Sequence, residues 1–148
     1  MIKKTKKPKK PKKPTRSLLV KKADRIFSIF IRLRDCDKDG YIVCPLCWAK
    51  IYRKDAQNMH FITRGCWLYR YDEINCHAGC MRCNVILNGN YIEYSLWMID
   101  QYWLEKVQEM KQKSKEVHKI PTYELESIIE YYTARVEELA KEKGISLN

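Results

Sequence analysis

Residues 74–84 read INCHAGCMRCN, and this stretch decides the fold. It contains the CxxC pair Cys80 and Cys83, and a first CxxC pair, Cys44 and Cys47, lies earlier in the chain with 32 residues between the two pairs. Two-residue spacing lets both thiolates of a pair reach one ion, and four thiolates complete a tetrahedral structural zinc site. The sequence therefore predicts one Zn²⁺ ion held by these four cysteines, in a closed site with no open position for catalysis.

The cysteine content and the start of the chain favour a reducing compartment. The chain has seven cysteines, an odd number, and it begins with lysines rather than with a secretory signal. No apolar run approaches the ~20 residues that a bilayer span needs. We therefore expect a cytoplasmic protein without a membrane segment, in which paired cysteines bind metal. A CxxC redox couple is the alternative, while Cys36, Cys66 and Cys76 are expected as small buried hydrophobic residues.

The positive charge is concentrated at the N-terminus. The net charge is +11, and residues 1–22 contain eleven Lys and Arg and no acid, which leaves 18 basic and 18 acidic side chains in the other 126 residues. Residues 1–16, MIKKTKKPKKPKKPTR, combine repeated prolines with like charges, which predicts a disordered and extended arm. We interpret it as an arm that binds nucleic-acid phosphates, with a solubilising tail as the alternative. The lysines expected to contact phosphates are Lys9, Lys10, Lys12 and Lys13.

Helical periodicity follows the arm. Ile26, Phe27, Phe30 and Leu33 recur at helical spacing and predict a helix over residues 18–34. The next segment, DCDKDG, imitates a calcium-binding loop, but the twelfth position counted from Asp35 is leucine rather than the glutamate that such a loop needs. We therefore expect a polar turn closed by glycine.

Two further helices are expected at the C-terminal end. Asn90 followed by Glu93 is typical of an N-cap and predicts a helix over residues 91–113, and Gly144 ends a last helix that begins after Pro121. Their apolar stripes are Ile92, Leu96, Ile99, Trp103, Val107 and Met110 on the first helix, and Leu125, Ile128, Ile129, Tyr132, Val136 and Leu139 on the second. We expect residues 91–148 to form an αα-hairpin by packing these stripes together, with a homodimer interface as the alternative.

The residues between the helices carry the candidate chemistry. Short β-prone pieces, GYIVC, IYR, MHFIT and WLYRY, predict a zinc knuckle and an irregular hairpin, and a helical stretch follows Cys80 until residues 88–90 break it. His60 lies in the MHFIT piece, and Asn84 directly follows Cys83 at the helix start, where its oxygen could bind Mg²⁺. A hairpin with a histidine, crossed by a helix that offers an oxygen ligand, is the ββα-metal arrangement. The predicted fold is therefore α+β, with a zinc-stabilised ββα-metal core in residues 17–90.

With these motifs the chain resembles the lambda-phage NinG/Rap recombination-protein family, an HNH-type endonuclease group with a treble-clef, ββα-metal core. The resemblance covers roughly residues 24–140. The stretches that carry it are FSIFIRLRD at 27–35, GYIVCPLC at 40–47, HFITR at 60–64, RYDEINCHAGCMRCN at 70–84 and GNYIEY at 89–94.

This resemblance implies a metal-dependent DNA endonuclease that acts on branched recombination intermediates of the Holliday-junction or D-loop type. His60 would be the general base, Asn75 the residue that braces the hairpin, and Asn84 a ligand of a catalytic Mg²⁺ or Mn²⁺. A neutral histidine can take a proton from water, and Mg²⁺ can stabilise charge on the phosphate and on the leaving oxygen. Arg64 and Arg70 are candidate phosphate contacts. The alternative is a zinc-stabilised nucleic-acid-binding protein that no longer cuts.

The chain departs from the family's usual residues at four positions. Asp, Gly, Gly and Gln are usual where this chain has Gln57, Met59, Trp48 and Gly79. The change at Gln57 removes a carboxylate from the expected metal site, and Asp55 can replace it only if the strand between them is regular. His77 is expected in the core, with a supporting or substrate contact as the alternative.

Overall fold

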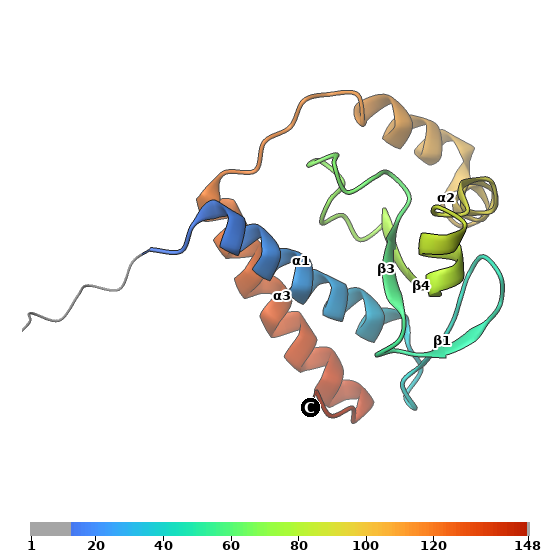
Figure 1. Cartoon of the computed structure of the whole chain (residues 1–148), viewed down its shortest axis with the longest axis horizontal. Helices are drawn as coiled ribbons and strands as arrows, with labels where there is room; N and C mark the ends of the chain where they lie inside the picture. The colour runs from blue at the N-terminus through green and yellow to red at the C-terminus, as the bar shows by residue number, and fades with distance from the viewer. Residues whose placement is uncertain (1–12, 148) are drawn as a thin grey trace, which may run out of the picture.

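A computed structural model of the chain describes residues 13–147, and Figure 1 shows how its elements are arranged. The strands form two separate antiparallel pairs, β1 with β2 and β3 with β4. The mixed α+β class is thus confirmed. Lys9, Lys10 and Lys12 lie outside the described residues, and Lys13 lies in irregular backbone before the first helix. The elements are α1 (Arg16–Asp35), β1 (Tyr41–Val43), β2 (Lys50–Tyr52), β3 (Gln57–His60), β4 (Cys76–Gly79), η1 (Arg82–Ile86), α2 (Tyr91–Lys113) and α3 (Thr122–Lys143).

Helix α1 forms where the apolar periodicity predicts it. Thr15 caps its N-terminus, because its side-chain oxygen accepts a hydrogen bond from the backbone N–H of Leu18. The helix ends in a polar turn in which Asp37 Oδ1 accepts backbone hydrogen bonds from Asp39 (2.9 Å) and Tyr41 (2.8 Å). Gly40 closes this turn with a φ of 83°, a conformation that glycine adopts without strain. The glycine-closed polar turn is confirmed.

The β-structure differs from expectation in its last strand. Residues 67–71, WLYRY, form turns, so the strand predicted there is wrong. The partner of β3 is instead β4, in a register that pairs Met59 with His77 and His60 with Cys76. Residues 61–75 connect these two strands and leave the sheet, so Trp67 and its neighbours lie in a loop rather than in a ladder, with Trp67 half-buried and Tyr69 buried.

Helix α2 has the predicted bounds but a different buried face. Trp103 has a φ of 67°, so a kink interrupts the helix and changes the phase of its stripe. Before the kink the expected core residues Ile92, Leu96 and Trp103 itself are exposed, with exposed fractions of 75%, 60% and 74%, and the buried residues are Tyr94 and Met98. Asn90 is the N-cap residue, as predicted, but its side chain makes no capping hydrogen bond and its backbone is left-handed.

Helix α3 packs on α1 rather than on α2, so the predicted αα-hairpin is wrong (Figure 1). Tyr132 of α3 lies between two rings of α1, with centroid separations of 4.8 Å to both Phe27 and Phe30. At its other end Lys143 Nζ donates to the carbonyl oxygens of Leu33 (2.6 Å), Arg34 (3.1 Å) and Cys36 (2.6 Å). A cation on these carbonyls satisfies the open C-terminal end of α1.

The packing gives α2 and α3 separate partners. The buried residues of α3 share their clusters with α1, whereas those of α2 cluster with Cys44, Met59, Cys80 and Cys83. Helix α2 therefore covers the cysteine-bearing segment, and α1 with α3 forms a second layer (Figure 1). None of the helices in residues 13–147 is long and apolar enough to cross a membrane.

Candidate functional site

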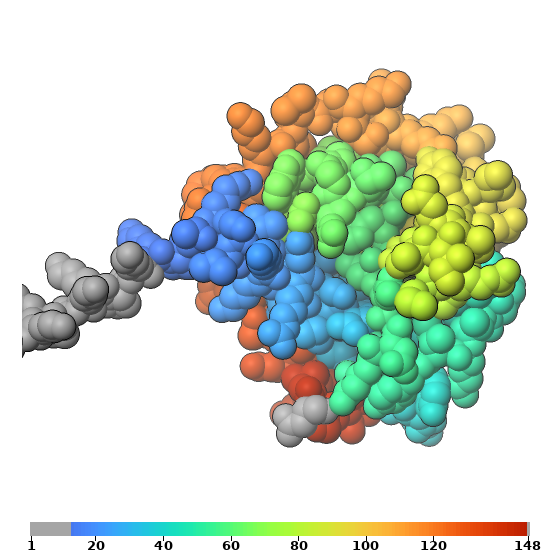
Figure 2. All heavy atoms as spheres, in the orientation of Figure 1, coloured from blue at the N-terminus to red at the C-terminus, as the bar shows by residue number. Residues whose placement is uncertain are grey.

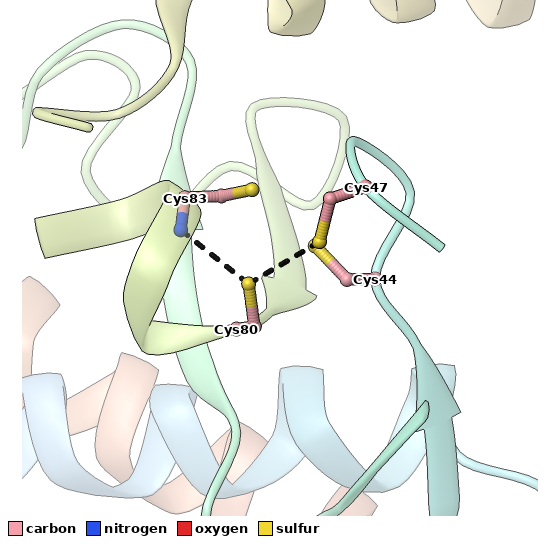
Figure 3. Close-up of side chains that lie close together, drawn as sticks. All are labelled: Cys44, Cys47, Cys80 and Cys83. Carbon is pink, nitrogen blue, oxygen red and sulfur yellow. Dashed lines mark hydrogen bonds between the residues drawn. The ribbon is translucent and has the colours of Figure 1, made fainter. Parts of the chain in front are cut away.

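The two CxxC pairs meet at one point, as the sequence predicts. Cys44 and Cys47 lie in the turn after β1, Cys80 lies directly after β4 and Cys83 lies in η1, so their side chains approach from two separate segments (Figure 3). The four sulfur atoms all lie within 4.8 Å of one another, and Cys47 Sγ is 3.5 Å from Cys80 Sγ. Within residues 13–147 this is the sole group of three or more His, Cys, Asp or Glu side chains that can hold a metal ion.

The cluster fits a tetrahedral metal such as zinc. Zn–S bonds of about 2.3 Å require sulfur separations of about 3.8 Å, which these side chains meet with small adjustments. The backbone N–H of Cys83 and the side-chain amide of Asn90 donate to cluster sulfurs at 3.4 and 3.7 Å. Burial raises the pKa of Cys44 and raises that of Cys83 to about 12, so a bound cation is needed to keep all four thiols ionised.

Two departures from the family's usual residues compensate each other beside this cluster. A side chain at Gly79 would place its Cβ 2.3 Å from Met59 Cε and 3.3 Å from Cys44 Sγ. Met59 is buried and fills that space from the neighbouring strand. Met59, in the position that it takes here, therefore leaves no room for a side chain at 79. The third departure, Trp48, has a φ of 63° at the end of the first cysteine turn, a conformation that glycine adopts more easily.

A cleft of about 730 Å³ lies between α1, β3 and the turn after η1. It brings together His60 and Gln57 of β3, Asn84 of η1, and Arg64 and Arg70 of the connecting loop. The sequence predicts four of these five as site residues and discusses Gln57 as a departure. We call this space the cleft. Helix α1 forms its other wall, which the sequence analysis misses, and contributes Asp24, Ser28 and Arg32.

His60 is held as a neutral base. Its Nε2 lies 3.1 Å from the backbone carbonyl oxygen of Arg70. A carbonyl can only accept, so in the neutral ring Nε2 carries the proton and Nδ1 is the basic nitrogen. Burial lowers the pKa of His60, and the positive charges of Arg64 and Arg70 lower it further, while hydrogen bonds to the backbone of Arg70 and of Asn58 oppose them. The ring is therefore uncharged at neutral pH and able to accept a proton.

Asn75 does not line the cleft but positions the loop that does. It is fully buried, and its Oδ1 accepts from Ile62 N (2.6 Å) while its Nδ2 donates to the carbonyl oxygens of Ile62 (2.9 Å) and Tyr69 (3.0 Å). The loop between β3 and β4 is thus tied at both ends. The carbonyl of Arg70 that holds His60 directly follows the tied residue Tyr69.

Asn84, the expected metal ligand, contacts Gln57, one of the residues that differ from the family's usual ones. Asn84 Nδ2 donates to Gln57 Oε1 at 2.7 Å. Asp55 does not line the cleft, because it lies in the turn before β3 rather than on the strand, so its proposed substitution for the missing carboxylate is wrong. The carboxylate at the cleft is Asp24, which binds Arg70 instead.

Arg70 is engaged by its own protein. Its Nε and Nη2 donate to Asp24 at 2.9 and 2.7 Å, and its Nη1 donates to the carbonyl oxygen of Arg64 at 2.9 Å. Although burial opposes it, the hydrogen bonds to Asp24 raise the pKa of Arg70. Arg70 therefore shapes the loop, whereas the side chain of Arg64 is exposed at the cleft.

His77 lies on the other face of the hairpin, as its register requires. It is buried, and its ring nitrogens lie 2.9 Å from Tyr94 Oη and 2.8 Å from Tyr102 Oη. Burial lowers its pKa to about 4. The expectation of a core histidine is confirmed. Of the unpaired cysteines, Cys36 and Cys76 are buried as expected and Cys66 is half-buried.

Comparison with known proteins places the chain in a family. Residues 2–142 match the family described as bacteriophage lambda NinG protein. The chain belongs to the NinG family. It is 29% identical over 124 residues to Protein ninG of Salmonella phage P22, covering 84% of this chain and 59% of that protein. It is 27% identical over 129 residues to Protein ninG of Escherichia phage 933W and 26% identical over 129 residues to that of Escherichia phage lambda.

These NinG relatives are longer than this chain. The matches to the 933W and lambda proteins each cover 87% of this chain, but 62% and 61% of those proteins. The chain thus spans about three fifths of the length of the curated relatives it matches. No solved structure matches the chain.

Proposed function

We propose that this NinG-family chain is a metal-dependent DNA endonuclease of phage recombination that cuts branched DNA of the Holliday-junction or D-loop type. The observation that carries the proposal is the cleft, where a neutral histidine, an asparagine next to the cysteine cluster and unpaired arginine charge meet. The reaction class is phosphodiester hydrolysis. The zinc-binding cysteines have a structural part in it, because four thiolates leave the ion no open position.

His60 acts in this proposal as the general base. Its Nδ1 takes a proton from water while the water oxygen attacks the phosphorus atom, and the bond from phosphorus to the 3′-oxygen breaks. The hydrogen bond from Nε2 to the Arg70 carbonyl orients the ring and favours the required tautomer. Asn75 acts indirectly, since its three hydrogen bonds fix the loop that carries this carbonyl.

Oxygen donors suited to Mg²⁺ or Mn²⁺ surround His60. The amide oxygens of Asn84 and Gln57 line the cleft, and Asn58 Oδ1 is buried there without a hydrogen-bond partner in the described residues. Amide oxygens fit Mg²⁺, which keeps several waters and takes further ligands from substrate phosphate. When bound, the ion would stabilise charge on the phosphate and the leaving oxygen. Because the amides are neutral, the substrate phosphate would supply most of the charge that holds the ion.

The distribution of positive charge supports a nucleic-acid partner. Arg64 and Arg32 line the cleft and form no ion pair with a carboxylate in residues 13–147. The lysine-rich residues 1–16 add further positive charge upstream of α1. Such charge attracts a phosphate backbone without reading its sequence. A homodimer stays a prediction, and its face would include the exposed residues Ile92 and Leu96 of α2.

A binding protein without cutting activity is the second candidate. The observation that favours it is the hydrogen bond from Asn84 to Gln57, which joins two neutral side chains where a carboxylate is usual. Restoring the carboxylate with Gln57→Asp separates the two candidates. If the missing charge weakens metal binding, this variant should need less Mg²⁺ for half-maximal cleavage than the wild type.

A nicking assay on a panel of four-way junctions, D-loops and linear duplexes, with and without Mg²⁺ or Mn²⁺, tests the proposal. The wild type should nick branched DNA only with the metal. His60→Ala should lose at least ~10²-fold in turnover while binding DNA as before, because a general base acts in the transition state. His118→Ala, at an exposed histidine remote from the cleft, is the matched control. Binding without nicking by wild type and by Gln57→Asp would establish the second candidate instead.

A further inference from the structure

Helix α1 presents a basic face to solvent next to the cleft. Lys21, Arg25, Ser28 and Arg32 follow one another at steps of four, three and four residues, which places them on one side of the helix. This side is opposite the buried residues such as Ala23 and Phe30. Figure 2 shows α1 on the visible surface, beside the segment that carries the β3–β4 loop. We call these four residues the α1 track.

Arg32, at the inner end of the track, has no carboxylate partner in the described residues. Its Nε and Nη1 donate to the backbone carbonyls of Ser28 (3.1 Å) and Arg53 (3.3 Å), and none of the ion pairs in the described residues includes it. The side chain is half-buried at the cleft wall. Burying a cation without a counter-charge is unfavourable. Burial lowers the pKa of Arg32, and the positive charge of Arg53 lowers it further.

The two edges of α1 differ in charge. On one edge the track runs into the cleft. On the other edge Lys22 lines a hollow together with Glu126, Glu130 and Glu137 of α3. A polyanion is attracted to the first edge and repelled from the second. The difference in charge between the two edges of α1 therefore favours a phosphate backbone along the track, which leads to the cleft.

The length of the track suits a nucleic-acid strand. The eleven residue steps from Lys21 to Arg32 span about 16 Å of helix at about 1.5 Å per step. One strand of a duplex advances about 3.4 Å per nucleotide along its axis, so the track faces about five phosphates. A single phosphorylated side chain or a small anion would need only one of these residues.

We propose that the α1 track binds the phosphate backbone of one strand of a duplex arm and guides it into the cleft, where Arg32 holds a phosphate close to His60. The inference rests on the proposed function for the identity of the reacting strand. It adds a binding surface upstream of the cleft, formed by a helix that precedes both CxxC pairs.

The test measures DNA binding separately from cutting. All variants are made in the full chain with His60→Ala, and binding to a labelled duplex and a labelled four-way junction is followed by fluorescence anisotropy over a salt series. Each of Lys21→Gln, Arg25→Gln and Arg32→Gln should lower the slope of log affinity against log salt by about 0.9, and the triple variant by about 2.7. Arg32→Gln should weaken affinity most, by about tenfold or more, because a charge-assisted hydrogen bond to phosphate is lost.

Lys22→Gln is the matched control, since it removes the same charge from the neighbouring residue on the acidic edge, and its slope should not change. An unchanged slope for the triple variant, or an equal loss for Lys22→Gln, overturns the inference even if the wild type nicks DNA. A reduced slope in a protein that never nicks DNA supports the track and refutes the endonuclease proposal. Circular dichroism checks that each variant is folded, above all Arg32→Gln, because Arg32 is half-buried and bonds two backbone carbonyls.

Discussion

Replacing Asn75 should destabilise this protein far more than an average substitution does. Its side chain is completely buried and makes three hydrogen bonds, at 2.6, 2.9 and 3.0 Å, to the backbone groups of two loop residues. Alanine at this position removes all three and leaves the N–H and C=O of Ile62 and the C=O of Tyr69 without these partners. Each hydrogen bond contributes about 1 kcal/mol net, and each unsatisfied buried group costs about 1–3 kcal/mol.

The expected loss for Asn75→Ala is therefore about 3–5 kcal/mol, allowing for partial relaxation of the loop. For a chain of this size that corresponds to a fall in Tm of about 10–16 °C. Asn75→Asp is the sharper variant. It keeps an acceptor for the Ile62 N–H but turns a carboxylate towards two carbonyl oxygens, so it should be destabilised as well.

Urea unfolding followed by circular dichroism, at fixed zinc concentration, measures both variants. Asn58→Ala is the matched control, because Asn58 lies on β3 and its Oδ1 has no hydrogen-bond partner in the described part of the chain. It should change the free energy of unfolding by less than about 1 kcal/mol. If Asn75→Ala proved as stable as this control, the loop would be held by other contacts and the bracing role of Asn75 would be refuted.

Three further outcomes are expected. Cys83→Ala should lose the bound zinc and leave the middle segment unfolded, because structural zinc contributes on the order of 10 kcal/mol or more to folding. Cys66→Ala, which lies outside the cluster, should keep one zinc per chain by elemental analysis. Burial lowers the pKa of His77 to about 4 in the folded protein, whereas in the unfolded chain it is about 6.5. The free energy of unfolding should therefore fall by about 3 kcal/mol as the pH drops from about 6.5 to about 4. His77→Gln should flatten this part of the pH profile, measured by denaturation at each pH with the zinc content checked. Trp48→Gly should raise the free energy of unfolding by about 1 kcal/mol, because the exposed side chain at φ 63° is strained, and a loss of stability instead would show that the indole makes a needed contact.

The sequence predicts the cysteine cluster well because its signal is local and chemical. A CxxC pair brings its two thiolates together through the geometry of one turn, and two pairs have one plausible common ion. His60 and Asn84 meet at the cleft for a related reason, since Asn84 directly follows a cluster cysteine and His60 lies on β3, the strand paired with β4, which leads to Cys80. The bounds of α2 and the end of α3 at Gly144 also follow from local backbone preferences.

The failures concern long-range packing and strained backbone. Helix α3 could bury its apolar stripe against either α1 or α2, and the periodicity of the sequence does not predict which. The fit of Tyr132 between Phe27 and Phe30 determines that it packs on α1. The phase of α2 is lost because Trp103 adopts a positive φ that no propensity predicts. Strand β4 escapes detection because its residues, CHAG, include no β-branched or large aromatic side chain and are all buried.

The part of the cleft that α1 supplies was missed for a different reason. Asp24 and Arg32 precede His60 by 36 and 28 residues in the sequence, and nothing in their local pattern refers to it. Their connection is a chain of contacts: Asp24 binds the Arg70 side chain, and the Arg70 carbonyl binds His60. Helix α1 and the proposed base His60 are thus linked through the loop residue Arg70. A link between such distant residues leaves no local pattern in the sequence.

The same geometry determines how metal and DNA should depend on each other. The carboxylate that faces the cleft is bound to Arg70, and Asn84 is bound to a neutral glutamine, so the protein offers Mg²⁺ oxygen atoms but little negative charge. The arginines that remain unpaired, Arg32 and Arg64, attract phosphate and repel a free cation. On the proposed function, DNA therefore binds first and its phosphate completes the metal site. Because binding free energies are reciprocal, Mg²⁺ must then strengthen DNA binding by the same factor by which DNA strengthens Mg²⁺ binding.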